Sequence, residues 1–402
     1  MTLQTWIIEP RDSLIVRDGK PFSAGVTHAT SLDFPFPSTT TGGVRTRSGL
    51  VDGVFDVSQI DSIKEIEVRG ALLAELDDEG EICVFYLPSP ADSLLLQDDE
   101  QKRNKAARLY PLLPLNIEKL SGNANKAQLS NLPEQVVFPV GLNRTKIKGK
   151  PYGDLKFWCW EVLENWLTPR IGSKPFIDIT NLENYGISSL QKDSRTHVAI
   201  NENLTSEDGA LFQTRGLEFN HGKGDLSKAK KLSLVVFLDE TNSKKLEDKG
   251  NLAPLGGERR LVSWRKSNHT KMPLVCPPEI VNGIGGYCGL LLLTPAFFEG
   301  GFLPKPNGDF EVKAIACNRY QTVSGWDFVL NEPKPSRRLV PAGSVFFLKL
   351  NGDDVQRRAW INKTWFSCIS EVDSESGQDF AKDGFGLCVL GTWDGIALEN
   401  WE

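Results

Sequence analysis

Long hydrophobic runs are missing from this sequence of 402 residues. The longest near-apolar run covers residues 289–298, whereas a helix that crosses a bilayer needs about 18 apolar residues or more. The N-terminal residues MTLQTWIIEPRD lack the basic start and the apolar stretch of a signal peptide. We therefore expect a cytoplasmic protein that has no membrane partner.

Paired metal-ligand motifs are also missing. The 7 cysteines include no C-x-x-C pair, and the 4 histidines include no H-E-x-x-H pair. An odd number of scattered cysteines argues against a disulfide framework and against a zinc ribbon. We expect small buried cysteines in a reducing compartment, no metal site and no cofactor.

Motifs for nucleotide binding and for catalysis are absent as well. No glycine-rich segment matches the phosphate-binding pattern G-x-x-x-x-G-K-[ST], and none gives G-x-G-x-x-G between a strand and a helix. No Ser/His/Asp or Cys/His arrangement is readable, so no catalytic residue is assigned. A metal-independent ribonuclease stays open, because His28 or His197 could serve as its general acid or base.

The net charge of −6 hides an uneven distribution. Residues 370–402 hold eight acids and one base, so the rest of the chain carries about +1. Basic clusters stand at 144–150, at 259–271 and at 334–338, each beside glycine or proline. Charge attraction is screened beyond about 8–10 Å at cellular salt, so a local cluster matters more than the total. Solvated loops and RNA phosphate contacts are both compatible with these clusters.

Glycine and proline are frequent, with 36 and 23 residues, and favour turn-rich β structure. Residues 6–9 predict a strand, 37–51 a helix, and 65–76 and 81–87 a strand pair joined by a hairpin turn at 77–80. Further along, residues 154–167 and 357–369 predict helices, and the apolar run at 232–238 predicts a buried strand. This β-α-β-β order opens a ferredoxin-like unit. Residues 88–153 interrupt it with many prolines and charges, and predict a projecting insertion. A second β-rich half begins near residue 270, so the expected class is α+β.

Three segments carry groups that suit phosphate. The turn Gly256–Gly257–Glu258 leads directly into Arg259 and Arg260; glycine lets a backbone approach phosphate closely, and arginine donates to its oxygens. Hydroxyls gather at the expected helix start, from Ser38 to Thr41. Arg17 and Lys20 flank a third turn, close to the N-terminus.

These motifs, taken in order, resemble one protein family. The runs IEPRDSLIVRDGKPF, FPFPSTTTGGVRT, SRTHVAIN, GALFQTRGL, LGGERR, LLLLTPAFFEGGFLP and RRLVPAGSVFF resemble the RAMP-superfamily subunit that holds the crRNA 5′ handle in Cmr (type III-B CRISPR) complexes. The resemblance extends to about residue 391. Its individual motifs are modest, and their order is what makes it specific.

The resemblance implies two ferredoxin-like (RRM-like) domains with glycine-rich loops, at 1–265 with the insertion at about 88–153, and at 270–402. It implies a non-catalytic subunit that binds the single-stranded 5′ handle of crRNA and joins the large polymerase-like subunit to a backbone subunit. The alternatives are a RAMP endoribonuclease that processes pre-crRNA and a structural scaffold without RNA contact.

The expected handle site is a cleft between the two domains, and the insertion would bring residues 144–150 near RNA. The acidic C-terminal stretch should lie away from the RNA. The residues expected to bind RNA are Arg17, Lys20, Ser38, Thr39, Thr40, Thr41, Arg45, Arg47, Arg144, Lys146, Lys148, Arg195, His197, Gly256, Gly257, Arg259, Arg260, Arg337 and Arg338.

Overall fold

The computed structural model describes residues 2–17, 31–116, 137–142, 149–168, 177–200, 202–203, 205–222, 229–268, 272–327 and 332–398. The chain forms two compact units, each built from three segments. Unit 1 consists of Met1–Cys83, Ser189–His269 and Thr322–Arg337; unit 2 consists of Val84–Ser188, Thr270–Gln321 and Arg338–Glu402. Antiparallel strands dominate and helices are few, so the α+β class is confirmed.

The division into units differs from the two continuous domains expected at 1–265 and 270–402. Residues 84–188, which include the expected insertion, belong to unit 2. Backbone hydrogen bonds explain this grouping: Phe138 donates to Lys313 (2.8 Å) and accepts from Ile315 (3.2 Å), and Ala91 donates to Gly343 (2.8 Å). The expected insertion is therefore tied to late parts of the chain.

The sheet of unit 1 is built around the N-terminal strand. Its strand order is β4 (Arg69–Leu76), β17 (Lys230–Asp239), β1 (Leu3–Pro10), β19 (Arg260–Ser267) and β18 (Leu252–Leu255). The short β16 (Asn220–His221) also pairs with β17. β1 pairs on both edges, with β17 and with β19. Its residues Ile7 and Ile8 point to opposite faces of the sheet and are completely buried, so both faces are covered there. The strand expected at 6–9 is thus confirmed and lies inside the sheet.

Besides its sheet, unit 1 contains the helices α1 (Pro37–Ser48), α2 (Ile60–Lys64) and α7 (Glu240–Glu247). The first begins with Pro37 and has Phe36 as its N-cap, not Ser38 as expected, because proline suits the first helical position. A Cβ on Gly43 would lie 2.8 Å from Leu255 Cδ1, so this glycine lets α1 approach β18 closely.

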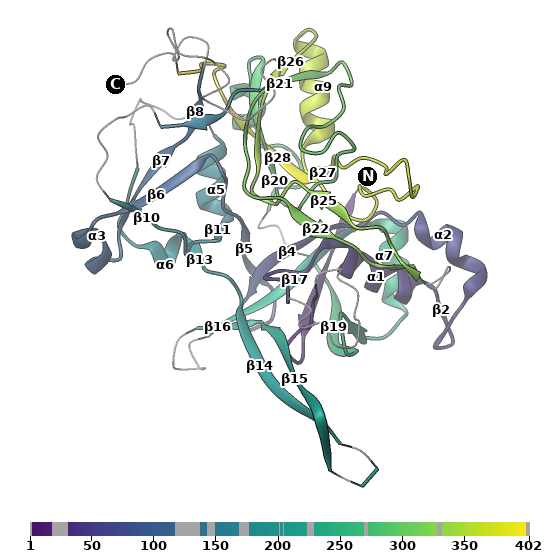
Figure 1. The fold of residues 1–402 in the computed structure, drawn as a ribbon. Coiled ribbons are helices and arrows are strands. Elements are labelled where there is room, and N and C mark those ends of the chain that lie inside the picture. Colours follow the sequence, from purple (N-terminus) through teal and green to yellow (C-terminus); the bar gives the residue numbers. More distant parts are fainter. Residues whose placement is uncertain are drawn as a thin grey trace. The chain divides into compact units, whose positions relative to one another are not determined.

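Unit 1 also contains two short strand ribbons and one long hairpin. The strands β2 (Leu50–Val51) and β3 (Val54–Phe55) form a small ribbon, followed by the 3₁₀ turn η1 (Val57–Gln59). A longer hairpin, β14 (Gln191–Ile200) and β15 (Ser206–Glu218), extends well beyond the sheet of unit 1 in Figure 1. The strands β23 (Trp326–Asp327) and β24 (Glu332–Pro333) form another ribbon.

Unit 2 has a five-stranded sheet in its C-terminal part. Its order is β21 (Phe310–Ala316), β26 (Val345–Leu350), β20 (Tyr287–Leu292), β28 (Leu387–Thr392) and β27 (Ser367–Cys368), and the helices α8 (Pro278–Gly283) and α9 (Asp354–Thr364) contact β28. The helix expected at 357–369 begins earlier because Asp353 and Gln356 form a capping box. It ends before Ser367–Cys368, which pairs with β28.

Two further groups of paired strands lie in the first segment of unit 2. In one, β11 (Phe157–Cys159) pairs with β5 (Ile82–Pro88) and with β13 (Gly186–Ile187). The other has the order β10 (Lys150–Pro151), β6 (Ser93–Gln97), β7 (Ala107–Pro111) and β12 (Ile177–Ile179). The helix expected at 154–167 covers only α5 (Trp160–Leu167), since residues 157–159 pair as a strand.

The remaining short elements are α3 (Asp99–Arg103), α6 (Leu182–Tyr185) and the strand pair β8 (Leu113–Pro114) and β9 (Val140–Gly141) in unit 2, together with β22 (Gln321–Val323) and β25 (Arg337–Leu339). Within the described ranges, no helix combines the length and the apolar character needed to cross a membrane. The cysteines are unpaired; Cys276, Cys288 and Cys388 are buried as expected, whereas Cys317 is exposed.

The acidic stretch 370–398 is folded into unit 2 and is not a tail. Asp373 and Asp383 are only 4% and 6% exposed. Asp373 accepts hydrogen bonds from the backbone of Glu375 and from the Ser376 hydroxyl, and Asp383 accepts one from Gln378. Leu398 forms a parallel bridge with Leu115. These acids therefore fix loops, and the stretch does not face solvent as a free segment.

Candidate nucleic-acid interface

Three segments that are distant in sequence meet in unit 1. Leu14 pairs with Leu217 at the base of the β14–β15 hairpin, with two N–H···O=C distances of 2.9 and 2.8 Å. The next residue, Ile15, pairs with Gly257 in the turn between β18 and β19, and its carbonyl accepts from the Gly257 N–H at 2.7 Å. Residues 12–17 thus lie between the hairpin base and the 256–259 turn.

The conformation of the 256–259 turn depends on Gly256. Its φ is +71°, and a Cβ at this position would lie 2.5 Å from the Ile15 carbonyl oxygen. Glu258 and Arg259 also have positive φ, at +58° and +52°. Non-glycine residues adopt this left-handed conformation rarely, so the turn aims its charged side chains in directions that an ordinary turn would not provide.

Six charged side chains form an alternating network across these segments, which we call the arginine–carboxylate network. Arg195 binds Asp193 (Nε–Oδ2, 2.5 Å) and Asp12 (3.0 Å). Arg260 binds the second oxygen of Asp12 and also Glu258, the latter at 3.1 Å. Glu258 in turn binds Arg17 at 3.2 Å. Three guanidinium groups are matched by three carboxylates.

Neighbouring charged groups of the network shift one another's pKa values. Burial raises the pKa of Asp12, but hydrogen bonds from the Ser13 N–H and from Arg195, with the charge of Arg260, bring it below the ordinary value. Hydrogen bonds to Asp193 and Asp12 raise the pKa of Arg195. The pKa of Glu218 is raised by burial and by the charges of Asp193 and Asp12. The shifts of Asp12 and Arg195 both favour the charged forms of these two groups.

Arg259 differs from the three arginines of the network. Its side chain is exposed and forms no ion pair with any residue in the part of the chain that the structure describes. It follows Glu258 directly in the turn, so a free guanidinium stands next to three paired ones. A free, exposed guanidinium is the group of this site that can bind an anion without first breaking an ion pair.

One further predicted residue, His197, lies close to this site. Side chains alternate along a strand, so Arg195 and His197 share one face of β14. His197 Nε2 lies 2.8 Å from Thr214 Oγ1, and Thr214 is buried. The structure thus brings together Arg17, Arg195, His197, Gly256, Gly257, Arg259 and Arg260.

The helix-start residues are placed differently. Thr40, Thr41 and Arg47 are buried, with 0%, 1% and 2% exposure. The Arg47 guanidinium lies over the Trp264 ring, 5.1 Å from its centroid, and donates to the Gly250 carbonyl at 2.7 Å. Arg45 donates to the Ile66 carbonyl at 3.0 Å. These side chains hold α1 in place, which corrects the expectation of a surface helix start with free hydroxyls; Ser38 and Thr39 are half-buried.

The other predicted residues do not join the network. Arg337 and Arg338 lie on β25, and the Arg338 guanidinium stands over the Tyr320 ring at 4.7 Å in unit 2. Lys20, His28, Arg144, Lys146 and Lys148 lie outside the described residues.

Sequence comparison gives the family. The sequence model described as CRISPR-associated protein (Cas_Cmr3) matches residues 6–393. The chain belongs to the Cmr3 family of CRISPR-associated proteins. The resemblance found in the sequence motifs is thereby confirmed, since Cmr3 proteins are RAMP-like subunits of Cmr complexes. No curated protein sequence matches the chain.

Two solved structures resemble this Cmr3-family chain over most of its length. A chain of the cryo-EM structure of the Type III-B Cmr-beta bound to cognate target RNA and AMPPnP, state 1, is 16% identical, with a TM-score of 0.46 and coverage of 95% of this chain and 93% of that chain. A chain of the Type III-B Cmr-beta bound to cognate target RNA is 15% identical, with a TM-score of 0.43 and coverage of 85% and 86%.

Sequence reasoning about this Cmr3-family chain missed the carboxylates of the network, Asp12, Asp193 and Glu258. Asp193 and Glu258 had a readable signal, because each stands within two residues of a predicted arginine, in D-S-R and in E-R-R. Only the folded chain brings Asp12 to Arg195 and Arg260, which are 183 and 248 residues away in sequence.

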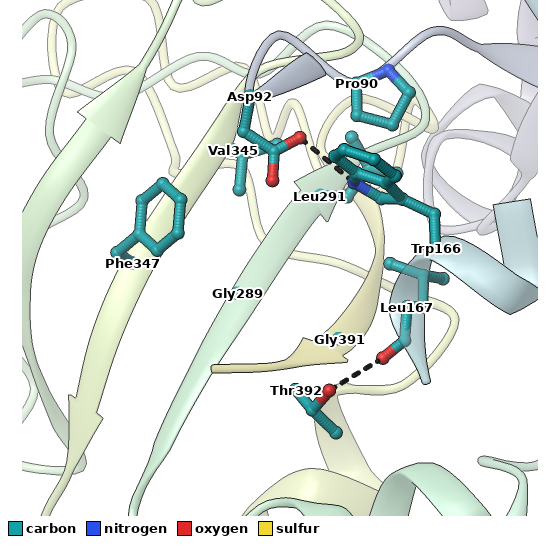
Figure 2. Close-up of a pocket in the computed structure, with 10 residues that line it drawn as sticks. All are labelled: Pro90, Asp92, Trp166, Leu167, Gly289, Leu291, Val345, Phe347, Gly391 and Thr392. Carbon is teal, nitrogen blue, oxygen red and sulfur yellow. Dashed lines mark hydrogen bonds between the residues drawn. The ribbon is translucent and has the colours of Figure 1, made fainter. Parts of the chain in front are cut away.

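Among the described residues, no metal site competes with this interface. In that part of the Cmr3-family chain, no three His, Cys, Asp or Glu side chains gather closely enough to hold a metal ion. Figure 2 shows a pocket in unit 2, where Trp166 donates to Asp92 at 3.2 Å and Thr392 to the Leu167 carbonyl at 3.3 Å. Its volume of about 40 Å³ is enough for only a few water molecules, each of which needs roughly 10–15 Å³ of such space, so no nucleotide fits.

Proposed function

We propose that this chain is a non-catalytic subunit of a type III-B CRISPR complex, and that unit 1 binds the single-stranded 5′ handle of crRNA. In this proposal its two units are ferredoxin-like. The subunit joins the large polymerase-like subunit to a backbone subunit. Membership of the Cmr3 family supports the setting, and the geometry of unit 1 supports the site.

One observation carries the RNA site: arginines from three separate segments meet at the 256–259 turn. Arg17 comes from the N-terminal segment, Arg195 from β14, and Arg260 from the start of β19. Single-stranded RNA is held by cations that follow its backbone, and arginine matches phosphate with two parallel hydrogen bonds. A row of guanidinium groups fits this task.

Arg259 is the sharpest test residue, because its side chain is exposed and its loss breaks no described ion pair. A hydrogen bond to a charged group contributes about 1.5–3 kcal/mol. Arg259→Ala should therefore weaken binding of labelled handle RNA at least about tenfold and flatten the salt dependence, with an unchanged Tm. Lys64→Ala removes an exposed cation from α2 of the same unit and serves as the matched control.

Two results would overturn the proposal. If folded Arg259→Ala binds RNA as well as the wild type, the turn has a structural role only. If labelled repeat RNA is cleaved without metal ions, and His197→Ala abolishes the cleavage, the chain is a ribonuclease. The remaining predicted contacts, at Lys20, Arg144, Lys146, Lys148, Arg337 and Arg338, stay predictions that the same titration can test one by one.

A further inference from the structure

The arginine–carboxylate network is electrically neutral although it lies where an anion is expected to bind. Arg17, Arg195 and Arg260 are each held by at least one carboxylate. Asp12 is the central member, because one oxygen binds Arg195 and the other binds Arg260. The Ser13 N–H fixes it further, donating to Asp12 Oδ1 at 2.8 Å.

A carboxylate and a phosphate compete for the same face of a guanidinium group. Both are anions that accept two parallel N–H bonds from arginine. A phosphate that approaches Arg195 or Arg260 must therefore displace Asp12 or share the donors with it. The exchange takes place near solvent, since the side chains of Asp12 and Arg195 are 37% and 44% exposed.

The same carboxylates also hold the guanidinium groups in a defined orientation before RNA arrives. An arginine side chain that is already ordered loses less conformational freedom when it binds. Exposed ion pairs contribute little to stability, so the fold does not depend on them strongly. Competition with phosphate lowers the affinity for RNA, whereas ordering of the arginines raises it. The competition is the larger effect, because each carboxylate cancels the charge of a cation that the RNA would otherwise bind.

We propose that Asp12 and Glu258 are built-in phosphate mimics, which occupy the RNA-binding arginines of unit 1 in the free protein and give way to RNA phosphates. This inference rests on the proposed RNA-binding function. Its consequence is that wild-type affinity is lower than the arginines alone would allow. Binding then favours an RNA that engages several of the arginines at once over one that touches a single arginine.

The test replaces the central carboxylate by its neutral isostere. Wild type and Asp12→Asn are titrated with a 5′-fluorescein single-stranded RNA of about 20 nucleotides, enough to cover a typical binding groove, at a series of salt concentrations. Asp12→Asn should bind about three- to tenfold more tightly. Its slope of log K against log salt should be steeper by about 0.7–1.4, which is one or two additional phosphate contacts at about 0.7 each.

The matched control is Glu247→Gln. Like Asp12→Asn, this substitution removes one negative charge from unit 1. The Glu247 carboxylate, however, binds Lys266, at 2.8 Å. Lys266 lies six residues along β19 from Arg260, or about 20 Å at 3.3 Å per residue. This exceeds the screening length of about 8–10 Å, so the control should change neither affinity nor slope.

The outcomes separate this inference from the function on which it rests. If wild type binds RNA and folded Asp12→Asn binds equally or more weakly with the same slope, Asp12 is structural and the inference is wrong. If wild type does not bind RNA at all, the proposed function fails and the inference fails with it. Should Asp12→Asn not fold, Glu258→Gln, which releases Arg17 and Arg260, gives the same test.

Discussion

Replacing Gly256 by alanine tests whether the approach of residues 12–17 to the β18–β19 turn depends on a missing side chain. Gly256 has φ +71°, and an alanine Cβ would lie 2.5 Å from the Ile15 carbonyl oxygen. Left-handed backbone costs an L-residue about 1–2 kcal/mol. Relief of the overlap moves Ile15 away and breaks the 2.7 Å bond from Gly257 N–H, which contributes about 0.5–1.5 kcal/mol.

The expected loss is therefore about 1.5–3.5 kcal/mol in the free energy of unfolding. Gly250→Ala is a close control, because Gly250 has φ +74° and an alanine Cβ there would meet no atom within 4 Å among the described residues. That variant meets only the cost of the backbone conformation, about 1–2 kcal/mol. The difference between the two variants isolates the contact with Ile15.

Urea unfolding followed by circular dichroism measures both losses, and RNA titration of the folded variants measures the effect on the site. Gly256→Ala should bind RNA more weakly than Gly250→Ala, because only the former shifts Arg17 relative to Arg260. Equal losses of stability in the two variants, or unchanged RNA binding by Gly256→Ala, would show that the reasoning about this contact is wrong.

Two further predictions concern pH and the C-terminal segment. Burial and the charges of Asp193 and Asp12 raise the pKa of Glu218, so its carboxyl group holds a proton more tightly in the folded state than in the unfolded state. The folded state therefore loses stability as the pH rises from about 4.5, the ordinary pKa, through the raised pKa. Glu218→Gln should then raise Tm at about pH 7 but not at about pH 3; an equal gain at both values would contradict this cause. Deletion of residues 395–402 removes the Leu398 bonds to Pro114 and Asn116 and should cost unit 2 about 1–3 kcal/mol while RNA affinity stays unchanged; a large drop in affinity of the folded truncation would contradict this.

Local sequence signals predicted the elements whose environment is visible in the sequence. The apolar run at 232–238 lies in β17, and the strand at 6–9 lies in β1. The glycine turn before Arg259 and Arg260 was also readable, because glycine followed by arginine is a local pattern. The expected hairpin turn at 77–80 is present, with the Gly80 N–H donating to Asp77 at 3.0 Å.

Features that depend on long-range pairing were not readable. Arg47 looks like a surface cation in sequence, yet it packs over Trp264, more than 200 residues away. The grouping of residues 84–188 with the C-terminal segments rests on backbone bonds such as that between Phe138 and Lys313. Asp12 has no local sign of its role, because both of its arginine partners come from distant strands.

Each unit is built from segments that are distant in sequence, so the order of synthesis limits when each sheet can form. The N-terminal strand β1 can pair only when β17 and β19 have emerged, which requires residue 267. The sheet of unit 2 needs β28, which ends at Thr392. At about 5–20 residues per second, the ribosome takes roughly 6–25 s to add the 125 residues between these points. From its own synthesis until β28 is complete, the strand 287–292 lacks one of its two partners, so one edge of this apolar strand stays unpaired in the nascent chain.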